Sequence, residues 1–375
     1  MKTCCLIIAI LVFASCNRTS QKLKTLPHDI SIISVNESDI VNDGKLSDVI
    51  SIDSLVFLEY TEGSIIGTIN KVIVSEEYIY ILDNENVNGI FCFDKKGNFV
   101  NSYIKVGRGP QEYSKIFDIS FFQDRIYVFA EPNQFFVLNK SLEYIESIEI
   151  KWTEDIPLIQ YDPYFSVIDS ETILFYHPSA PYHYHIYNLN KGDFISSHIK
   201  RLGTFDISFY KHITKNDSGI IFLSRIFNDT IYTISGKKIR PEYIVNFEKP
   251  MTDKEIEEQL KLTVFNAFNY PLPQKMYNIT RFISNEEFVS FEFLFKRYGY
   301  FCFYNKEKNS VKIFNNSLGN DFFLNPTIGH YQNSIVTWID VAGLVENREL
   351  LSFSIPDNLT YDSNPALGFY KPKFK

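Results

Sequence analysis

Short runs of β-branched and aromatic residues recur along the chain, and a polar turn precedes each of them. Such residues suit the pleated, half-buried surface of a strand. The runs begin at Tyr78, Arg125, Thr172, Gly219, Glu287 and Ser334. Neighbouring starts are 47 residues apart, as from Tyr78 to Arg125, except that 68 residues separate Gly219 from Glu287. A period of this length indicates a repeat architecture.

The longer step contains a helical pattern. Thr252 and Glu255 have the spacing of a capping box, and Pro271 and Pro273 follow as helix terminators. Apolar residues recur between them at helical spacing, namely Ile256, Leu260, Val264, Phe265 and Phe268. We therefore expect one inserted helix over residues 252–268.

Each period holds further strand patterns downstream of its first run. In the first period these are residues 90–93 and 99–104, which the turn 94–98 separates. Four strands in such a period make one propeller blade. The sequence thus predicts an all-β fold, a six-bladed β-propeller of four-stranded antiparallel blades over residues 48–375.

The two ends of this predicted ring complement one another. The last blade lacks one strand after residues 366–370, and a spare strand, residues 54–58, precedes the first blade. A free sheet edge exposes unpaired backbone groups. We expect the N-terminal strand to close the last blade.

The N-terminus has the pattern of an export signal. Lys2 is followed by an apolar run, residues 4–13, which is too short for a permanent membrane span of about 20 residues. The run ends in Phe13-Ala14-Ser15-Cys16, which resembles a bacterial lipobox. This predicts a lipoprotein signal peptide over residues 1–15, lipid on Cys16, and a tether and N-terminal segment over residues 16–47. The alternative is an ordinary secretion signal with an incidental cysteine.

Composition narrows the possible partners and chemistry. The chain has 34 Phe and 24 Tyr, in keeping with sheet, and its net charge of −8 argues against nucleic acid as a partner. Cys92 and Cys302 lie between aromatic residues in matching strings, so we expect them to be buried packing residues. We find no phosphate loop, nucleophile elbow or paired zinc motif in the sequence, and we expect no cofactor.

Several motifs carry a family resemblance. They are Ile65-Ile66-Gly67, Lys71-Val72-Ile73, the run 78–83, Gly107-Arg108-Gly109-Pro110-Gln111-Glu112-Tyr113 and Asn364-Pro365-Ala366-Leu367. With these the chain resembles the six-bladed β-propeller lipoproteins of gut Bacteroidetes and, more distantly, NHL-repeat and TolB-like propellers. The resemblance implies a propeller in the cell envelope and brings no established activity. Residues 17–20 lack the acidic side chains typical of surface-exported members, which favours the periplasmic face of the outer membrane.

The Gly107–Tyr113 segment is a first candidate site. It links the outer strand of one blade to the inner strand of the next, and its glycines and proline suit a tight connection. If the loop rims the central channel, Arg108 and Glu112 could grip a ligand. The alternative is a purely structural link.

A second candidate is a ring of channel residues. Seven positions before the run starts lie Lys71, Asp118, Phe165, His212, Thr280 and Thr327. These positions are equivalent on the innermost strands, and Arg281 follows Thr280. If they face the axis, they combine a cation, a carboxylate and an imidazole in one ligand site. The alternative is a polar, water-filled channel.

Three histidines form a weaker candidate for a metal site. His183 and His185 alternate along one predicted strand, and His177 could supply a third nitrogen. The same residues are equally consistent with a blade turn and a solvated outer strand, so no metal is predicted.

Two classes of function fit this pattern. One is a binding or interaction propeller for a glycan, a peptide or a protein, held at the membrane through the lipid on Cys16. The other is a channel-centred enzyme of hydrolase, lactonase or lyase type. A calcium-dependent lactonase needs several carboxylates on the axis, and Asp118 is the only one in the proposed ring. Binding is therefore favoured.

Overall fold

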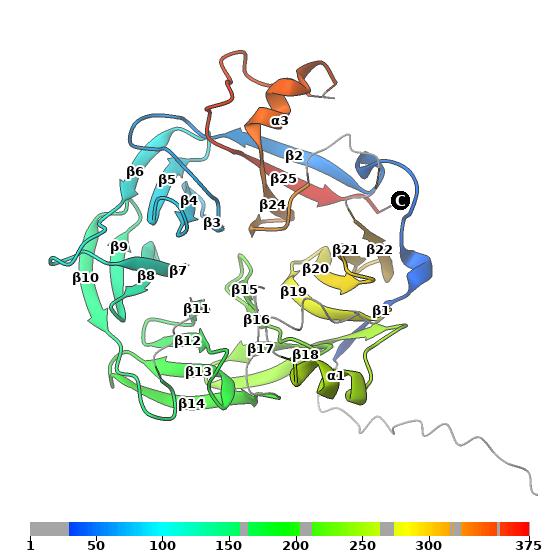
Figure 1. Ribbon diagram of the computed structural model, residues 1–375, viewed down its shortest axis with the longest axis horizontal. Coiled ribbons are helices and arrows are strands. Elements are labelled where there is room, and N and C mark those ends of the chain that lie inside the picture. The colour runs from blue at the N-terminus through cyan, green and yellow to red at the C-terminus, as the bar shows by residue number, and fades with distance from the viewer. Residues whose placement is uncertain are drawn as a thin grey trace, which may run out of the picture.

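Six antiparallel sheets stand around a central axis as the blades of a propeller (Figure 1). The computed structural model describes residues 30–157, 164–202, 212–262, 274–315, 318, 324–350 and 353–374. The predicted fold, an all-β six-bladed propeller with four-stranded antiparallel blades, is confirmed. Cys16 and residues 1–15 lie outside the described residues.

In blades 1 to 5 the four strands follow the chain from the axis outward, in blade 6 the first three do so, and the predicted runs form the second strands. Blade 1 comprises β3 (Lys71–Val74), β4 (Tyr78–Asp83), β5 (Gly89–Asp94) and β6 (Phe99–Tyr103), and blade 2 comprises β7 (Lys115–Phe122), β8 (Arg125–Glu131), β9 (Gln134–Asn139) and β10 (Tyr144–Glu149). Blade 3 comprises β11 (Tyr164–Val167), β12 (Thr172–Tyr176), β13 (Tyr182–Asn188) and β14 (Asp193–Lys200), and blade 4 comprises β15 (Ile213–Lys215), β16 (Ile221–Leu223), β17 (Thr230–Ser235) and β18 (Lys238–Phe247). Blade 5 comprises β19 (Met276–Ser284), β20 (Phe288–Phe295), β21 (Tyr298–Asn305) and β22 (Ser310–Phe314), and blade 6 comprises β23 (Gly329–Tyr331), β24 (Ser334–Ile339), β25 (Ala366–Pro372) and β2 (Ile50–Phe57).

The ring closes through its N-terminal strand. β2 pairs antiparallel with β25, from Ile50 opposite Pro372 to Phe57 opposite Ala366, and becomes the outer strand of blade 6. The expected closure is thus confirmed. It joins β2, which precedes blade 1 in the chain, to the C-terminal strand in one sheet.

The apolar core is divided among the junctions between neighbouring blades. Each junction holds one cluster of buried side chains, contributed by the facing sides of two sheets. Between blades 2 and 3, for example, the rings of Phe135 and Phe165 lie 4.8 Å apart edge to face. Cys92 and Cys302 are fully buried in two of these clusters, as expected. A blade therefore depends on both of its neighbours for burial.

The segment before β2 adds a strand that the sequence analysis did not predict. β1 (Ser31–Val35) pairs in parallel with β18 and buries Ile33 and Val35 between blades 4 and 5 (Figure 1). Two short 3-10 turns, η1 (Glu37–Asp39) and η2 (Leu46–Asp48), lead from β1 to β2. Glu37 forms ion pairs with Lys249 and Lys296, so polar contacts also hold this segment against the ring.

The helices agree only partly with the sequence analysis. α1 (Asp253–Leu260) begins at the predicted capping box of Thr252 and Glu255, and the expected continuation through residues 263–268 lies outside the described residues. The expectation of a single helix is wrong, because α3 (Val341–Glu346) and a 3-10 turn, η3 (Arg348–Leu350), follow β24. α3 contains a glycine and two valines, which favour helix weakly, so burial of Val341 and Leu344 stabilises it.

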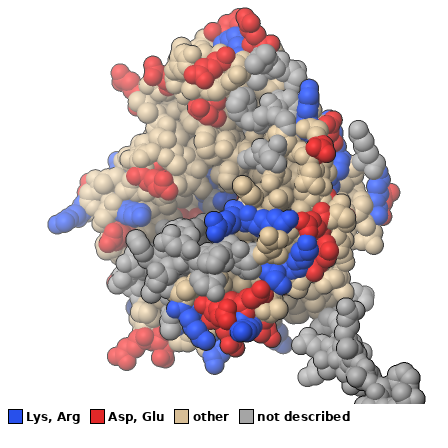
Figure 2. Space-filling view, turned by 45° about the vertical axis from the view of Figure 1, so that its right-hand side comes forward, with Lys and Arg blue, Asp and Glu red and all other residues tan. Residues whose placement is uncertain are grey.

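Two features of the described residues bear on membranes and on charged partners. Among the described residues, no helix has the length and apolar character needed to cross a bilayer. Basic and acidic side chains are interspersed on the face that Figure 2 shows.

One glycine fixes the contact between β2 and blade 1. Gly97, in the turn between β5 and β6, has a φ of +91°, and a Cβ at this position would lie 2.1 Å from the carbonyl oxygen of Phe57. The N–H of Glu59 donates to the carbonyl of Gly97 over 2.8 Å. The turn therefore holds the end of the closing strand.

We expect Gly97→Ala to lower the free energy of unfolding by about 3 kcal/mol or more, because it adds a steric clash to the strain of a left-handed backbone. Gly236→Ala is the matched control: its φ is +58°, and no atom lies within 4 Å of the added Cβ. That variant should lose only about 1 kcal/mol. Urea unfolding of both variants measures the difference, and equal losses would contradict the contact with Phe57.

Candidate functional site

A cavity of about 720 Å³ opens at one end of the central channel. Its mouth lies where the innermost strands end, at the turns that contain Ser75, Gln123, Asn216 and Gln332. Its volume is in the range of small-molecule sites, about 300–1,000 Å³. This pocket, called the channel pocket below, is lined by residues of all six blades.

Each of the six innermost strands contributes one residue to a part of the pocket wall that all blades share. These residues are Val72, Ile119, Ser166, Ile213, Arg281 and Ile328. Each of these residues directly follows a residue of the expected ring, and three of the expected residues, Lys71, Phe165 and Thr327, line the pocket as well. The six residues form a mainly apolar waist with one cation, Arg281, and the side chains of Val72, Ile119 and Ile328 are buried between the blades.

Part of the predicted ring does assemble at the pocket. The ammonium of Lys71 lies 2.7 Å from a carboxylate oxygen of Asp118 and donates to the carbonyl of Ile119 over 2.6 Å. The other carboxylate oxygen of Asp118 accepts the N–H of Phe165 over 3.2 Å. Lys71, Asp118 and Phe165 thus fasten blades 1, 2 and 3 together, and each contact joins residues about one period apart.

Arg281 and Thr327 also line the pocket, on its blade 5 and blade 6 sides. Arg281 forms an ion pair of 2.9 Å with Glu292, whose other oxygen accepts the N–H of Thr327 over 2.8 Å. Arg281 has a φ of +52° within an irregular stretch of β19, which turns its side chain toward the axis. Thr280 is buried instead and is paired with Glu292 in the sheet.

His212 does not face the channel, contrary to the expected ring. Its ring is buried against Tyr176 of blade 3, with 5.2 Å between the ring centroids, and Nδ1 lies 3.0 Å from the hydroxyl of Ser224. The residue precedes β15, where the chain still lies against the neighbouring blade. His212 is therefore part of the junction between blades 3 and 4.

The sequence analysis missed a second lysine of the pocket. Lys215, at the end of β15, lines the cavity together with Ser120, His330 and Tyr331. An innermost strand presents its edge to the axis, so both of its faces flank the channel. Counting four positions before the run starts, in addition to seven, would have found Lys215 and His330.

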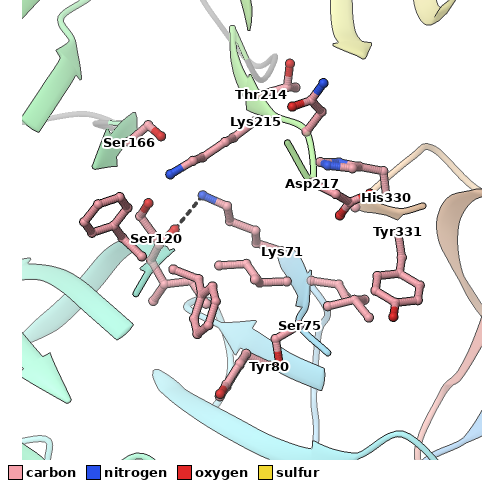
Figure 3. Close-up of a pocket in the computed structure, with 18 of the residues that line it drawn as sticks. Lys71, Ser75, Tyr80, Ser120, Ser166, Thr214, Lys215, Asp217, His330 and Tyr331 are labelled. Carbon is pink, nitrogen blue, oxygen red and sulfur yellow. Dashed lines mark hydrogen bonds between the residues drawn. The ribbon is translucent and has the colours of Figure 1, made fainter. Parts of the chain in front are cut away.

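Lys71 and Lys215 approach one another from opposite sides of the pocket (Figure 3). The ammonium of Lys215 donates to the carbonyl of Val167 over 3.0 Å and lies 5.0 Å from the centre of the Phe122 ring. Burial lowers the pKa of Lys215 to about 8.

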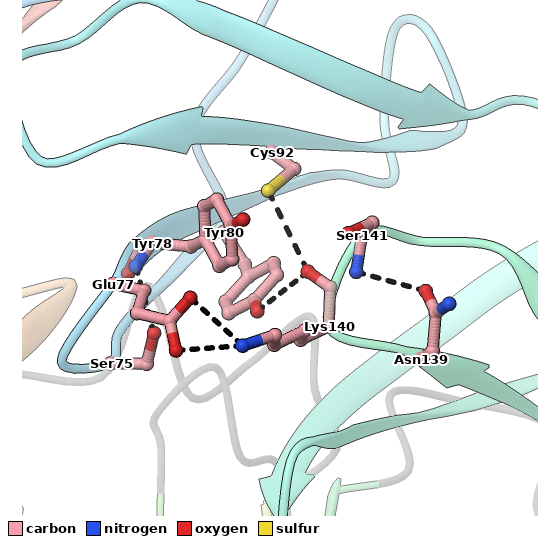
Figure 4. A network of polar contacts seen from close by, with 8 residues as sticks. All are labelled: Ser75, Glu77, Tyr78, Tyr80, Cys92, Asn139, Lys140 and Ser141. Carbon is pink, nitrogen blue, oxygen red and sulfur yellow. Dashed lines mark hydrogen bonds and ion pairs between the residues drawn. The ribbon is translucent and has the colours of Figure 1, made fainter.

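A polar network borders the mouth between blades 1 and 2 (Figure 4). The carbonyl of Lys140 accepts the hydroxyl of Tyr80 over 2.8 Å, and its ammonium lies 2.7 Å from Glu77. Cys92 lies beside it, 3.9 Å from the same carbonyl. Burial raises the pKa of the Cys92 thiol to about 12, which suits packing rather than nucleophilic chemistry.

Arg108 and Glu112 lie at the other end of the blades. Their connection joins β6 to β7, so it lies where innermost strands begin, whereas the pocket opens where these strands end. The loop borders a separate hollow over β9 and β10. Glu112 accepts the N–H of Gly109 over 2.6 Å, and a Cβ on Gly107 would meet its carboxylate. The structure thus separates this loop from the channel pocket, and Glu112 stabilises the loop itself.

The three candidate metal-binding histidines are buried in blade 3. Nδ1 of His177 accepts the N–H groups of Ser179 and Ala180, so Nε2 carries the proton that it donates to the carbonyl of Pro157. In His185 the two ring nitrogens are bonded to Ser197 and to the carbonyl of Tyr182. His183 lies on β13, the third strand of the blade, which is buried rather than solvated. Its ring stacks on that of Tyr176. No cluster of His, Cys, Asp or Glu in the described part of the chain could hold a metal ion.

Comparison with known proteins agrees with this architecture. A family model described as a domain of unknown function, DUF4934, matches residues 30–371. The chain belongs to the DUF4934 family. The match includes β1, so the strand added to blade 4 is part of the family unit. No curated protein matches this DUF4934 member.

Solved structures resemble this DUF4934 propeller in fold. A candidate exported protein of Bacteroides fragilis is 15% identical, with a TM-score of 0.73 over 92% of this chain and 100% of its own. Virginiamycin B lyase of Staphylococcus aureus is 10% identical, with a TM-score of 0.43 over 86% of this chain and 99% of its own.

Because several histidines of this DUF4934 propeller are buried, we expect the protein to lose stability in acid. Burial lowers the pKa of His212 to about 3 and those of His183 and His185 to about 4, from a usual value of 6.5. The unfolded chain therefore binds more protons between about pH 4 and pH 6.5, so stability is complete above this range and falls as pH drops through it. Each histidine contributes about 1.4 kcal/mol per pH unit.

Urea unfolding at pH 7.5 and pH 5.5 should differ by about 4 kcal/mol for the three histidines together. His212→Asn retains a polar atom near Nδ1 without a titrating ring, and should remove about a third of this difference. His198→Gln, on the half-exposed strand β14, is the control and should leave most of it. An unchanged pH dependence in His212→Asn would contradict the assignment.

Proposed function

We propose that this chain is an exported, lipid-anchored propeller that binds a small polar ligand, or the end of a larger one, in the channel pocket. The observation that carries the proposal is the convergence of side chains from all six blades on one cavity of about 720 Å³. Its apolar waist lies beside cations and hydroxyl groups, which is the combination typical of small-molecule sites. A glycan unit or a peptide end fits this description. A channel-centred enzyme remains the alternative function.

The proposed location rests on the N-terminal sequence. Lipid on Cys16 would hold the domain at the membrane, and residues 17–29 provide a polar tether before β1. The description of the Bacteroides fragilis structure as a candidate exported protein is consistent with this location. We propose the periplasmic face of the outer membrane, and we propose no nucleic-acid partner.

Ligand binding can be tested by a thermal-shift screen of oligosaccharides, short peptides and metabolites. A ligand that binds only the folded state raises the melting temperature. At one hundred times its dissociation constant it stabilises the folded state by about 2.7 kcal/mol. Ser166→Phe places a large ring on the waist and should abolish the shift. A product released during incubation would favour the enzyme.

Arg108→Ala is the matched control for this screen, since Arg108 is exposed at the opposite end of the blades. It should bind as the wild type does. Loss of binding in Arg108→Ala with retention in Ser166→Phe would move the site to the β6–β7 connection and refute the channel pocket.

Lipid anchoring predicts that Cys16→Ser releases the protein from membranes. Wild-type protein should partition into the detergent phase of a cloud-point separation and incorporate a labelled fatty acid, because acyl chains add apolar surface. Cys5→Ser, within the apolar run, is the control and should remain membrane-bound. Equal partitioning of the Cys16→Ser variant and the wild type would argue for an incidental cysteine.

A further inference from the structure

Lys215 differs from the other cations of the channel pocket in its partners. Lys71 is paired with Asp118, Arg281 with Glu292, and Lys140 with Glu77. Among the described residues, no carboxylate lies within ion-pair distance of the Lys215 ammonium, which bonds only the carbonyl of Val167. The pocket therefore has one positive charge that no carboxylate of the described residues neutralises.

This charge is costly where it lies. Lys215 is half-buried beside the Phe122 ring, and its ammonium points toward that of Lys71 (Figure 3). A desolvated ammonium without a counter-ion raises the free energy of the folded state. An anion placed between the two lysines would offset this cost.

Hydroxyl donors accompany the two ammonium groups. The hydroxyl oxygen of Ser120 accepts the N–H of Val167, which leaves its proton to donate. Ser166 belongs to the waist and lies on the same side as Lys215 in Figure 3. Two ammonium groups and two hydroxyls from four blades thus surround one space, and charge-assisted hydrogen bonds of this kind are the strong ones.

The surrounding charges limit what the anion can be. Of the two lysines only Lys71 is paired with a carboxylate, that of Asp118, so the described groups here have a net excess of a single positive charge. Toward the mouth, the pocket is lined by exposed acidic residues, Glu76, Asp124 and Asp217. A second negative charge would meet like charges there. A monoanion fits, and the rest of the ligand should be neutral or positively charged.

We propose that Lys215 and Lys71 form a binding site for a single monoanionic group, a carboxylate or a sulfate ester, of the ligand in the channel pocket. This proposal rests on the proposed function, and it assigns an acidic group to the ligand of the channel pocket. The anion lies at the waist, its oxygens accept hydrogen bonds from both ammonium groups and from Ser120 and Ser166, and the remainder of the ligand extends to the mouth.

The site can be tested without the natural ligand, using acetate as the probe and acetamide as its neutral counterpart. The full mature chain is acylated with trace labelled acetic anhydride at pH 8, and each lysine is quantified by peptide mass spectrometry. The pKa of Lys215, about 8, leaves much of this amine neutral and reactive. Its neighbours that also carry or titrate charge are Lys71, Asp118, Asp217, Arg281 and His330.

Saturating acetate should reduce the labelling of Lys215 about five-fold, as expected if a bound anion raises its pKa by one unit. Acetamide should leave it unchanged, and exposed Lys238 is the internal control for both. Methyl sulfate should act as acetate does. Equal protection by acetate and acetamide would overturn the proposal, and stronger protection by phosphate dianion would overturn the monoanion assignment.

Variants provide a second measurement. Acetate should raise the melting temperature of the wild type and of Lys215→Arg, which keeps the charge, but not that of Lys215→Met. Lys215→Met should fold, because it keeps an apolar stem and removes an unneutralised charge. Stabilisation of Lys215→Met equal to that of the wild type would overturn the proposal.

The outcomes of the two experiments are distinguishable. Acetate that protects Lys215 while no compound of the screen binds would support the anion site and contradict the proposed ligand binding. A neutral compound that binds the wild type and Lys215→Met equally would support ligand binding and contradict the anion site.

Discussion

The structure depends on the closure of the ring by the pairing of β2 with β25. Each blade is apolar on both faces, and its side chains become buried only when a neighbouring blade packs against each face. An open array would leave two apolar faces and two strand edges in water. Closure by β2 joins a segment that precedes blade 1 to the last strand of blade 6, so all blade junctions support one another.

Closure also determines what the channel can contain. The innermost strands meet the axis by their edges, so both faces of each strand contribute side chains to the pocket. Most of the waist is apolar, and the charges around it are used first to join blades, as in the pairs of Lys71 with Asp118 and Arg281 with Glu292. The ammonium of Lys215 bonds only a carbonyl of the neighbouring blade and no carboxylate of the described residues, so its charge is available for a ligand.

Several residues that the sequence marked as candidates for binding or for metal ligation stabilise the fold outside the channel pocket. Glu112 stabilises its own loop, at the end of the blades opposite the channel pocket. His177, His185 and His212 are buried, and their hydrogen bonds hold turns and blade junctions. Burial keeps these imidazoles neutral, which links them to stability in acid.

The sequence by itself determined the number of blades, their second strands, the closing strand and the start of α1. These features follow from local periodicity and capping, which short stretches of chain carry in full. Only the tertiary structure decided which side chains meet at the axis. A shift of one residue turns a side chain to the other face of its strand, and irregular pairing in β7 and β19 produces such shifts. The parallel pairing of β1 and the position of Lys215 opposite Lys71 likewise depend on contacts between distant segments, because only the closed ring brings them together.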